Sequence, residues 1–229
     1  MRKKTTAAVT AALMIAAAAV TATPASARTT AATAATATCN LTAPYRVVIG
    51  QPYKEFKLYA SGVCSLGEAF SSWNLIHPSQ GDQGSAYFSG SNQDIWGVYD
   101  FHTIGIHTWR PSIAYDSGTT QLSQNTLQSD IRLATAAWIT SKRTKDVVTL
   151  TGTSLLYSTG SDSYFKRSAK GAFQFKERGT TTWKGLKAVT TNSAGVATMA
   201  YRYSKTRDYR FVLYTTPVSW DQASATTTR

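Results

Sequence analysis

The chain alternates apolar and polar residues in many short runs, and turn residues separate these runs. In the first half the alternation covers Phe56–Ala60, Trp73–Ile76, Ile95–Phe101 and Ser129–Leu133. The segments between these runs are rich in Gly, Ser, Asn and Asp. Short period-two runs bounded by such turns are typical of half-buried β-strands. The pattern predicts an all-β protein.

The same alternation is most regular between Gly171 and Tyr214. Each strand predicted there has one apolar face, which is what a two-layer antiparallel β-sandwich requires. Leu186 and Ala188 are expected to face inward, and Val218–Thr226 can supply a final strand. The Thr and Ile residues around 131–139 favour a strand that runs directly from the first half into the second. We therefore predict two sandwich domains in tandem, residues 39–135 and 136–229.

The first 27 residues have the three parts of a secretory signal peptide. Arg2, Lys3 and Lys4 are positively charged, Ala7–Val20 is apolar, and Ala25-Ser26-Ala27 is a small-residue cleavage site. The apolar part is too short to span a bilayer. Residues 28–38 contain mostly Ala and Thr, so we expect a disordered spacer. The mature protein should be secreted, either free outside the cell or associated with the cell wall.

Cys39 and Cys64 are the two cysteines of the chain, and in an exported protein they most simply form one disulfide. The turn around Gln51 lies midway between them. If residues 45–49 and 55–60 are the arms of a hairpin, the cysteines meet at its open end. The alternative is a free thiol that acts as a nucleophile.

Positive charge is concentrated in the second half. Residues 39–135 hold five basic and seven acidic side chains, whereas residues 136–229 hold fifteen basic and five acidic ones. Such a surface attracts polyanions, including wall teichoic polymers, anionic polysaccharides, phospholipid headgroups and nucleic acids. The alternative is that the charge only keeps the protein soluble. The candidate polyanion-binding residues are Lys142, Arg143, Lys145, Lys166, Arg167, Lys170, Lys184, Lys187, Arg202, Lys205, Arg207 and Arg210.

Segments VTLTGT, FQFKERGTTTWKGLKAVTTNSAGVATMAY and YRFVLY resemble immunoglobulin-like domains of secreted actinobacterial proteins, in which an F-x-F strand precedes a Gly turn, a Trp and a T-T-N-x-x-G turn. The first half resembles the same class through W-N-L, Y-D-F and G-I-H-T-W. The resemblance implies two tandem immunoglobulin-like β-sandwiches and export, and it specifies no ligand. The cysteines depart from the antibody pattern, because their short separation would join neighbouring strands and not the two sheets.

Other residue patterns indicate no specific chemistry. Trp96 and Trp183 are candidate aromatic contacts for sugar rings, with packing in a core or interface as the alternative. Asp100, His102 and His107 lack a third metal ligand at a clear spacing. Oxygen ligands for Ca²⁺ could come from loop residues, without a calcium-binding motif. These loop residues are Asp82, Asn92, Asp94 and Asp116.

The sequence therefore predicts a non-catalytic binding or structural protein that uses no cofactor and no metal. Motifs for serine nucleophiles and for reading specific nucleic-acid sequences do not occur. One alternative is a secreted inhibitor that presents the loop Ser158–Lys170 to a hydrolase. Another is a glycan-active enzyme whose carboxylates meet only in the fold.

Overall fold

The structure of the protein is a computed structural model. It describes residues 37–66 and 69–229, so the expected signal peptide and residues 28–36 of the expected spacer lie outside the described residues. The described elements are β-strands and one 3-10 helix, Val63–Leu66. The prediction of an all-β protein is confirmed.

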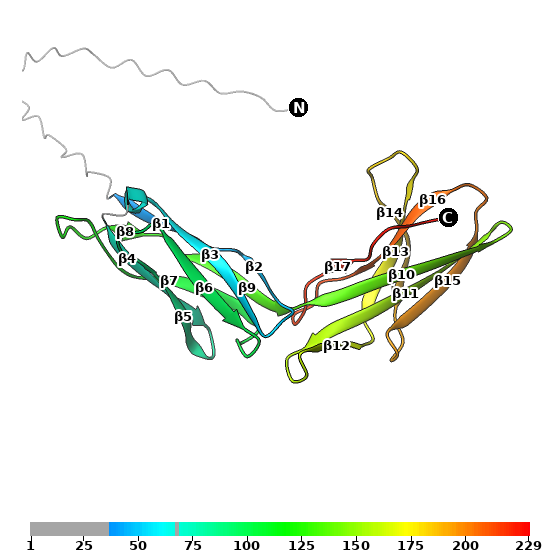
Figure 1. The fold of residues 1–229 in the computed structure, drawn as a ribbon, viewed down its shortest axis with the longest axis horizontal. Coiled ribbons are helices and arrows are strands. Elements are labelled where there is room, and N and C mark those ends of the chain that lie inside the picture. Colours follow the sequence, from blue (N-terminus) through cyan, green and yellow to red (C-terminus); the bar gives the residue numbers. More distant parts are fainter. Residues whose placement is uncertain (1–36, 67–68) are drawn as a thin grey trace, which may run out of the picture. The chain divides into compact units, whose positions relative to one another are not determined.

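Two sheets form the first sandwich (Figure 1). One has the strand order β6-β3-β1-β8, and the other has the order β2-β9-β7-β4-β5. The strand bounds are β1 Thr38–Thr42, β2 Arg46–Ile49, β3 Tyr53–Gly62, β4 Phe70–His77, β5 Gly81–Phe88, β6 Gln93–Tyr99, β7 Gly105–Tyr115, β8 Ser123–Gln124 and β9 Leu127–Leu133.

The topology of this sandwich is immunoglobulin-like. β3 pairs with β6 in one sheet and β4 pairs with β7 in the other, so the chain crosses repeatedly between the sheets. β2 runs parallel to β9 at the edge of the larger sheet. Trp73 on β4 is fully buried, at the place where immunoglobulin domains bury a core tryptophan. The predicted fold class is therefore confirmed for the first half.

The predicted disulfide between Cys39 and Cys64 is present, with Cα atoms 5.2 Å apart. The hairpin on which we based it is wrong. β3 pairs with β1, whereas β2 pairs with β9 in the opposite sheet, so the turn near Gln51 moves the chain from one sheet to the other. Cys39 lies on β1 and Cys64 lies in the 3-10 helix after β3. The disulfide thus joins β1 to the 3-10 helix that directly follows its neighbouring strand β3.

The expectation that Trp96 on β6 contacts a ligand is also corrected. Trp96 is 3% exposed, and its ring centroid lies 5.2 Å from that of Trp109 in the core. Tyr99 and Phe101 are exposed on the other side. Because both faces of this run carry large apolar side chains, the alternation alone does not show which face meets the core. Trp96 is therefore part of the core and is removed from the candidate aromatic contacts.

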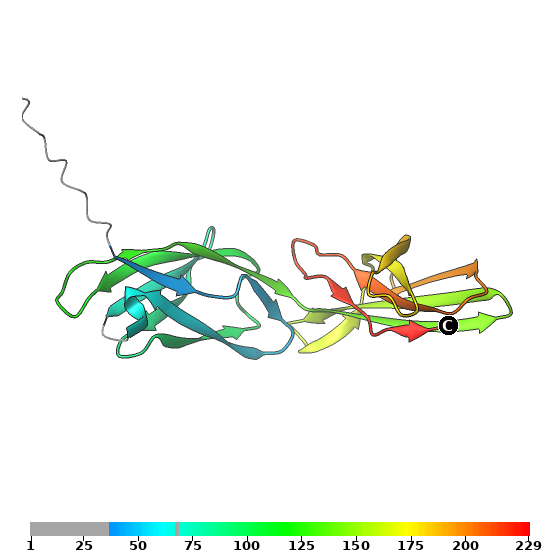
Figure 2. The same ribbon diagram turned by 90° about the horizontal axis from the view of Figure 1, so that it is seen from above.

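The second sandwich also has two layers, which the turned view of Figure 2 shows. In one sheet β10 pairs with one edge of β11, and β12 and β15 both pair with the other edge. The second sheet has the order β14-β13-β16, and the short strands β17 and β18 both pair with β16. The strand bounds are β10 Thr135–Thr144, β11 Val147–Ser158, β12 Ser163–Lys166, β13 Lys170–Glu177, β14 Lys184–Thr190, β15 Val196–Arg202, β16 Arg207–Leu213, β17 Gln222–Ala223 and β18 Thr227–Thr228.

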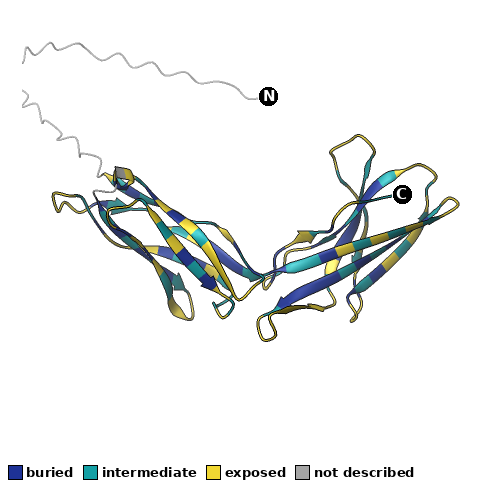
Figure 3. Cartoon of the chain, in the orientation of Figure 1, coloured by how far each residue is buried: buried dark blue, intermediate teal, exposed yellow. Residues whose placement is uncertain are grey.

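Aromatic side chains fill the core of this sandwich. The rings of Phe173 and Phe211 lie 5.1 Å apart, and both residues are fully buried. Gly152 on β11 faces them, and a Cβ atom there would lie 2.7 Å from the Phe211 ring. A glycine is therefore required for this close packing. Figure 3 shows more buried and less buried positions alternating along the first part of β11.

A β-bulge explains one difference from the predicted pattern. The pairing of β13 with β14 shifts register between Phe173 and Gln174. Leu186 packs against the core as expected, but Ala188 is exposed and Val189 packs instead. An extra residue in one strand interrupts the two-residue period, which the sequence pattern does not reveal.

The chain after β16 is fixed by Trp220. Its Nε1 donates to the Val47 carbonyl at 2.8 Å, and the guanidinium groups of Arg46 and Arg132 each lie 4.5 Å from its ring centroid. Ser219 forms a parallel bridge with Leu133 at the end of β9. Two short strands, β17 and β18, take the place of the single strand expected over Val218–Thr226.

Candidate functional site

The structure divides the twelve candidate basic residues into two groups. Nine are exposed, and three arginines are partly buried and hold other parts of the chain. The exposed residues are Lys142, Lys145, Lys166, Arg167, Lys170, Lys184, Lys187, Arg202 and Lys205. The partly buried arginines are Arg143, Arg207 and Arg210.

Arg143 connects two loops at one end of the second sandwich. Its guanidinium donates to the carbonyl oxygens of Tyr203 and Lys205, the second at 2.8 Å. The backbone N–H of Tyr203 also donates to the Asp146 carbonyl at 2.7 Å. The β10–β11 turn and the β15–β16 loop are therefore held side by side. Arg143 contributes mainly to structure.

Arg207 and Arg210 are likewise engaged with the protein. Arg207 Nε donates to Glu177 at 2.7 Å, and its guanidinium lies 3.4 Å from the centroid of the Tyr203 ring. Arg210 Nε donates to Gln174 at 2.8 Å. The Arg210 guanidinium lies 4.3 Å from the Trp183 ring centroid. These contacts make both arginines parts of the fold and leave them less available to a ligand.

Trp183 is partly buried on the outer face of its sheet. Besides Arg210, the Lys176 ammonium lies over its ring at 5.4 Å from the centroid. Cations above an aromatic ring are attracted to its negative face. Protein cations thus compete with a sugar ring for Trp183. Of the two tryptophans expected as aromatic contacts, Trp96 is buried in the core and Trp183 already contacts two cations of the protein.

Four exposed cations gather around the end that Arg143 holds together. We call Lys142, Lys145, Arg202 and Lys205 the hairpin-end cluster. Lys142 and Arg202 lie on the same outward sheet face, two strands and two residues apart by register, which places their Cα atoms about 12 Å apart. Lys145 lies in the β10–β11 turn, and Lys205 in the β15–β16 loop.

Few negative charges oppose this cluster. Asp146 lies 3.8 Å from Arg202, but both side chains are largely exposed, so the pair is weak. Glu177 and Asp208 are occupied by other partners. The hydrogen bond from Arg207 lowers the pKa of Glu177, and bonds from Thr228 and Arg178 lower the pKa of Asp208. The cluster therefore keeps most of its positive charge for solvent or a ligand.

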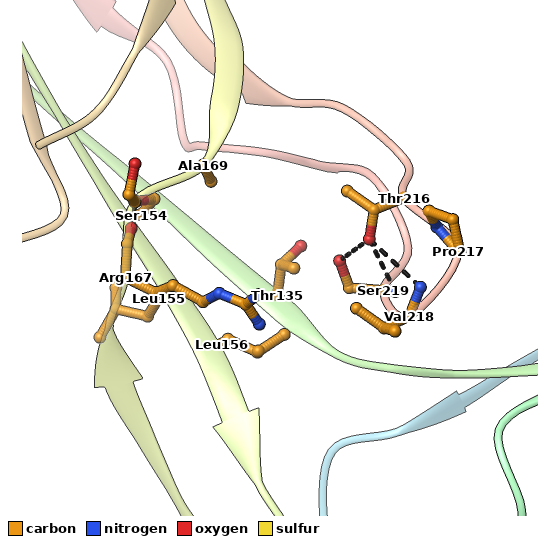
Figure 4. A pocket seen from close by; sticks show the side chains of 11 residues that line it. Thr135, Ser154, Leu155, Leu156, Arg167, Ala169, Thr216, Pro217, Val218 and Ser219 are labelled. Atoms are coloured by element: carbon orange, nitrogen blue, oxygen red, sulfur yellow. Dashed lines mark hydrogen bonds between the residues drawn. The ribbon is translucent and has the colours of Figure 1, made fainter. Parts of the chain in front are cut away.

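A second group, Lys166, Arg167 and Lys170, lies at the connection between β12 and β13. Ser154–Leu156, Arg167 and Thr216–Ser219 are among the residues that line a pocket of about 300 Å³ there. Figure 4 shows the Arg167 side chain reaching across this pocket toward the turn of Thr216–Ser219. Within the described chain, its guanidinium has no hydrogen-bond or ion-pair partner. The pocket is mainly apolar and too small for a polymer, so Arg167 is not part of an extended polyanion-binding surface.

Lys184 and Lys187 are exposed on β14, the edge strand of its sheet. Their side chains have no ion-pair partner within residues 37–66 and 69–229. They lie on the opposite sheet from Lys142 and Arg202. The twelve residues therefore do not form one continuous patch, and four of them form the best-defined cluster.

The histidines are not arranged as a metal site. His107 is fully buried, its ring lies 4.9 Å from that of His77, and burial lowers its pKa. His102 lies in the loop after β6 and accepts a bond from the Tyr99 N–H at 2.9 Å. Within the described parts of the chain, no group of three His, Cys, Asp or Glu residues could hold a metal ion.

The loop carboxylates that we considered for Ca²⁺ accept hydrogen bonds from backbone N–H groups. Asp82 accepts from the Gly84 N–H at 3.0 Å, and Asp116 accepts from the Thr120 N–H at 2.7 Å. Asp94 accepts from two backbone N–H groups. Such turn-stabilising bonds are the usual role of Asp in loops.

One aromatic group was missed by the sequence analysis. Tyr53, Tyr99, Phe101 and His102 pack together at the end of β6, and Phe101 is 77% exposed. The run Ile95–Phe101 has large apolar side chains on both faces, and its alternation alone does not show that Tyr99 and Phe101 are the exposed ones.

Comparisons with known proteins define no family for this chain. No family model matches it, and no curated protein matches it. An Escherichia coli alpha-2-macroglobulin is 11% identical with a TM-score of 0.41, and the match covers 85% of this chain but only 14% of that protein. A marsupial T cell receptor is 11% identical with a TM-score of 0.33, over 84% of this chain and 71% of that one. A DUF3823 family protein from Bacteroides uniformis is 8% identical with a TM-score of 0.31, over 84% and 98%.

The immunoglobulin-like fold therefore rests on the strand order and the buried core of the chain itself. No helix in residues 37–66 and 69–229 is long and apolar enough to cross a membrane.

Proposed function

We propose that this chain is an exported, non-catalytic binding protein that holds anionic polymers at the hairpin-end cluster. The observation that carries the proposal is that Lys142, Lys145, Arg202 and Lys205 lie on or beside the two loops that Arg143 ties together. The signal peptide and the disulfide between Cys39 and Cys64 support export to an oxidising compartment.

The arrangement suits a flexible polyanion better than a small anion. The Cα atoms of Lys142 and Arg202 are about 12 Å apart by strand register, and Lys145 and Lys205 lie on two further loops, so the four cations are spread over more surface than one small anion covers. A polymer that carries one charge per repeat can neutralise several such cations at once and release its counterions. Affinity of this kind comes from charge density and falls steeply with salt.

Three carboxyl groups of the described chain favour a structural role over a catalytic one. A general acid of a glycosidase needs a raised pKa. Hydrogen bonds from cations or hydroxyls instead lower the pKa of Glu177, Asp208 and Asp221. Each of them takes part in an ion pair with an arginine. They support the fold as anions.

The inhibitor alternative required an extended loop over Ser158–Lys170. In the structure, residues 163–166 form β12 and pair with β11, and Tyr157 Oη donates to Asp162 at 3.1 Å. The irregular chain that remains is short on both sides of β12. We therefore favour polymer binding over inhibition. Capture of a stoichiometric protein partner from culture fluid would support the inhibitor hypothesis instead.

The test compares two double variants that lose the same charge. K142Q/K205Q removes two cluster cations, whereas K57Q/R110Q removes two exposed cations of the first sandwich. Binding to immobilised heparin and to polyphosphate is measured at low and high salt. We expect K142Q/K205Q to weaken binding by about tenfold and K57Q/R110Q to change it by less than about twofold. Equal losses would mean that net charge alone is responsible, and absence of binding by the unchanged protein would reject the proposal.

A further inference from the structure

An aromatic groove lies on the first sandwich and shares no residue with the hairpin-end cluster. Its lining includes Asp82, Gln83, Tyr99, Phe101, His102 and Thr103. The space that they border measures about 550 Å³. Exposed aromatic side chains in a hollow with a few polar groups are typical of a small-ligand site.

The rings of the groove are nearly parallel and open to solvent. Tyr99 is inclined by 15° to Phe101 and by 3° to His102, and Phe101 is inclined by 17° to His102. The three centroid separations are 5.0, 6.0 and 5.6 Å. These lengths form a triangle, so the three rings do not form a single column. Tyr99 and Phe101 are exposed, so these two rings remain accessible to a ligand.

Tyr53 and Gly97 hold the aromatic rings of the groove in position. Tyr53 lies 4.8 Å from Tyr99, and its hydroxyl donates to Glu55 at 2.9 Å. A Cβ atom on Gly97 would lie 2.8 Å from the Tyr53 ring, so a glycine is needed for the ring to lie over β6. Tyr53 supports Tyr99 from the side and keeps its ring in place.

Polar groups with free positions surround the rings. His102 Nδ1 accepts from the Tyr99 N–H at 2.9 Å, so in the neutral ring the proton is on Nε2, which is left as a donor. Asp82 uses Oδ1 for the Gly84 N–H, and its other oxygen makes no hydrogen bond within the described chain. One donor and one acceptor beside an aromatic face can bind neighbouring hydroxyl groups.

We propose that this groove binds a neutral polysaccharide or oligosaccharide, with a pyranose ring stacked on Phe101 and Tyr99. The C–H face of a sugar ring is apolar and flat, and its hydroxyl groups lie at the rim, which matches the rings and the polar groups of the groove. The carboxylates of Asp82 and Glu55 favour an uncharged sugar over uronic or sulfated ones. The proposal goes beyond polyanion binding and does not depend on it, since the two sites have different residues and opposite charge.

The experiment measures binding of the full secreted chain to cello-, chito-, xylo-, manno- and laminari-oligosaccharides by calorimetry. An oligogalacturonide serves as the anionic counterpart. All titrations are done at about 1 M NaCl, where the Debye length is about 3 Å and binding through the basic cluster is suppressed. A failure of polyanion binding would therefore leave the result of this experiment unchanged.

We expect at least one neutral oligosaccharide to bind and the oligogalacturonide not to bind. Phe101→Ala should weaken sugar binding by about tenfold or more, which is typical for loss of a stacking ring. Because Phe101 is 77% exposed, this variant should fold normally. Tyr87→Ala is the matched control, since Tyr87 is 56% exposed on the same sandwich but lies outside the groove, and it should change binding by less than about twofold.

Asp82→Asn tests the charge argument, because the amide oxygen can still accept from the Gly84 N–H. We expect it to reduce the preference for neutral over anionic sugars. The proposal is overturned if no neutral sugar binds with a Kd below about 10 mM. It is also overturned if Phe101→Ala binds as the unchanged protein does, or if a proline-rich peptide binds in place of the sugars.

Discussion

Arg143 and Lys142 are neighbours on β10 with the same charge, and we predict opposite consequences of replacing each with glutamine. Arg143 donates two hydrogen bonds to loop carbonyls, whereas the Lys142 ammonium is exposed without a partner in the described chain. A hydrogen bond from a charged group is worth about 1.5–3 kcal/mol. One of these two bonds is exposed, so we assign about 2–3 kcal/mol to both together.

The assay is urea unfolding followed by circular dichroism. With a slope of about 2 kcal/mol per molar urea, R143Q should lower the midpoint by about 1 M. K142Q should leave the midpoint nearly unchanged, as surface substitutions usually do, and should weaken heparin binding. R143K should fall between them, because an ammonium does not reproduce the forked geometry of the guanidinium. If R143Q unfolds at the same urea concentration as K142Q, the structural role of Arg143 is refuted.

Two further predictions concern the second sandwich. Gly152→Ala should destabilise the protein by about 1–3 kcal/mol, since the new methyl group meets a core ring, while Gly185→Ala has open space and should change stability by less than about 0.5 kcal/mol in the same urea assay. The pKa of Asp208 is lowered in the folded state, so its contribution is complete above the unfolded pKa of about 4 and is lost as pH falls through the folded pKa. Thermal melts from pH 6 down to pH 2 should therefore show a smaller acid-induced loss for D208N than for the unchanged protein, and parallel curves would contradict this reasoning.

The sequence was sufficient for the strand pattern, the fold class and the cysteine pair. These features depend on local alternation and on composition, which a single sequence displays directly. Pairing partners depend on long-range hydrogen bonds, and there the reasoning failed. Residues 45–49 have the pattern of a hairpin arm, but they find their partner in β9, more than eighty residues later in the chain.

The candidate site was predictable in charge and not in geometry. The excess of basic residues identified the second sandwich, but the sequence does not distinguish Arg143, which binds backbone carbonyls, from Lys142, which faces solvent. The same limit applies to the tryptophans. Trp96 and Trp183 are of the residue type that often stacks on sugars. In the structure Trp96 fills the core, and the Arg210 guanidinium lies over the ring of Trp183. Phe101 became visible as a candidate only once its exposure was known.

The central claim is that a defined set of four cations, and not the overall charge, binds anionic polymers. The most direct test is the slope of log K against log salt concentration for heparin, with the unchanged protein and with K142Q/K145Q/R202Q/K205Q. If each cation displaces about one counterion, the negative slope should become shallower by about three to four units in the variant. A slope that stays the same in the variant, with the fold intact by circular dichroism, would contradict the account.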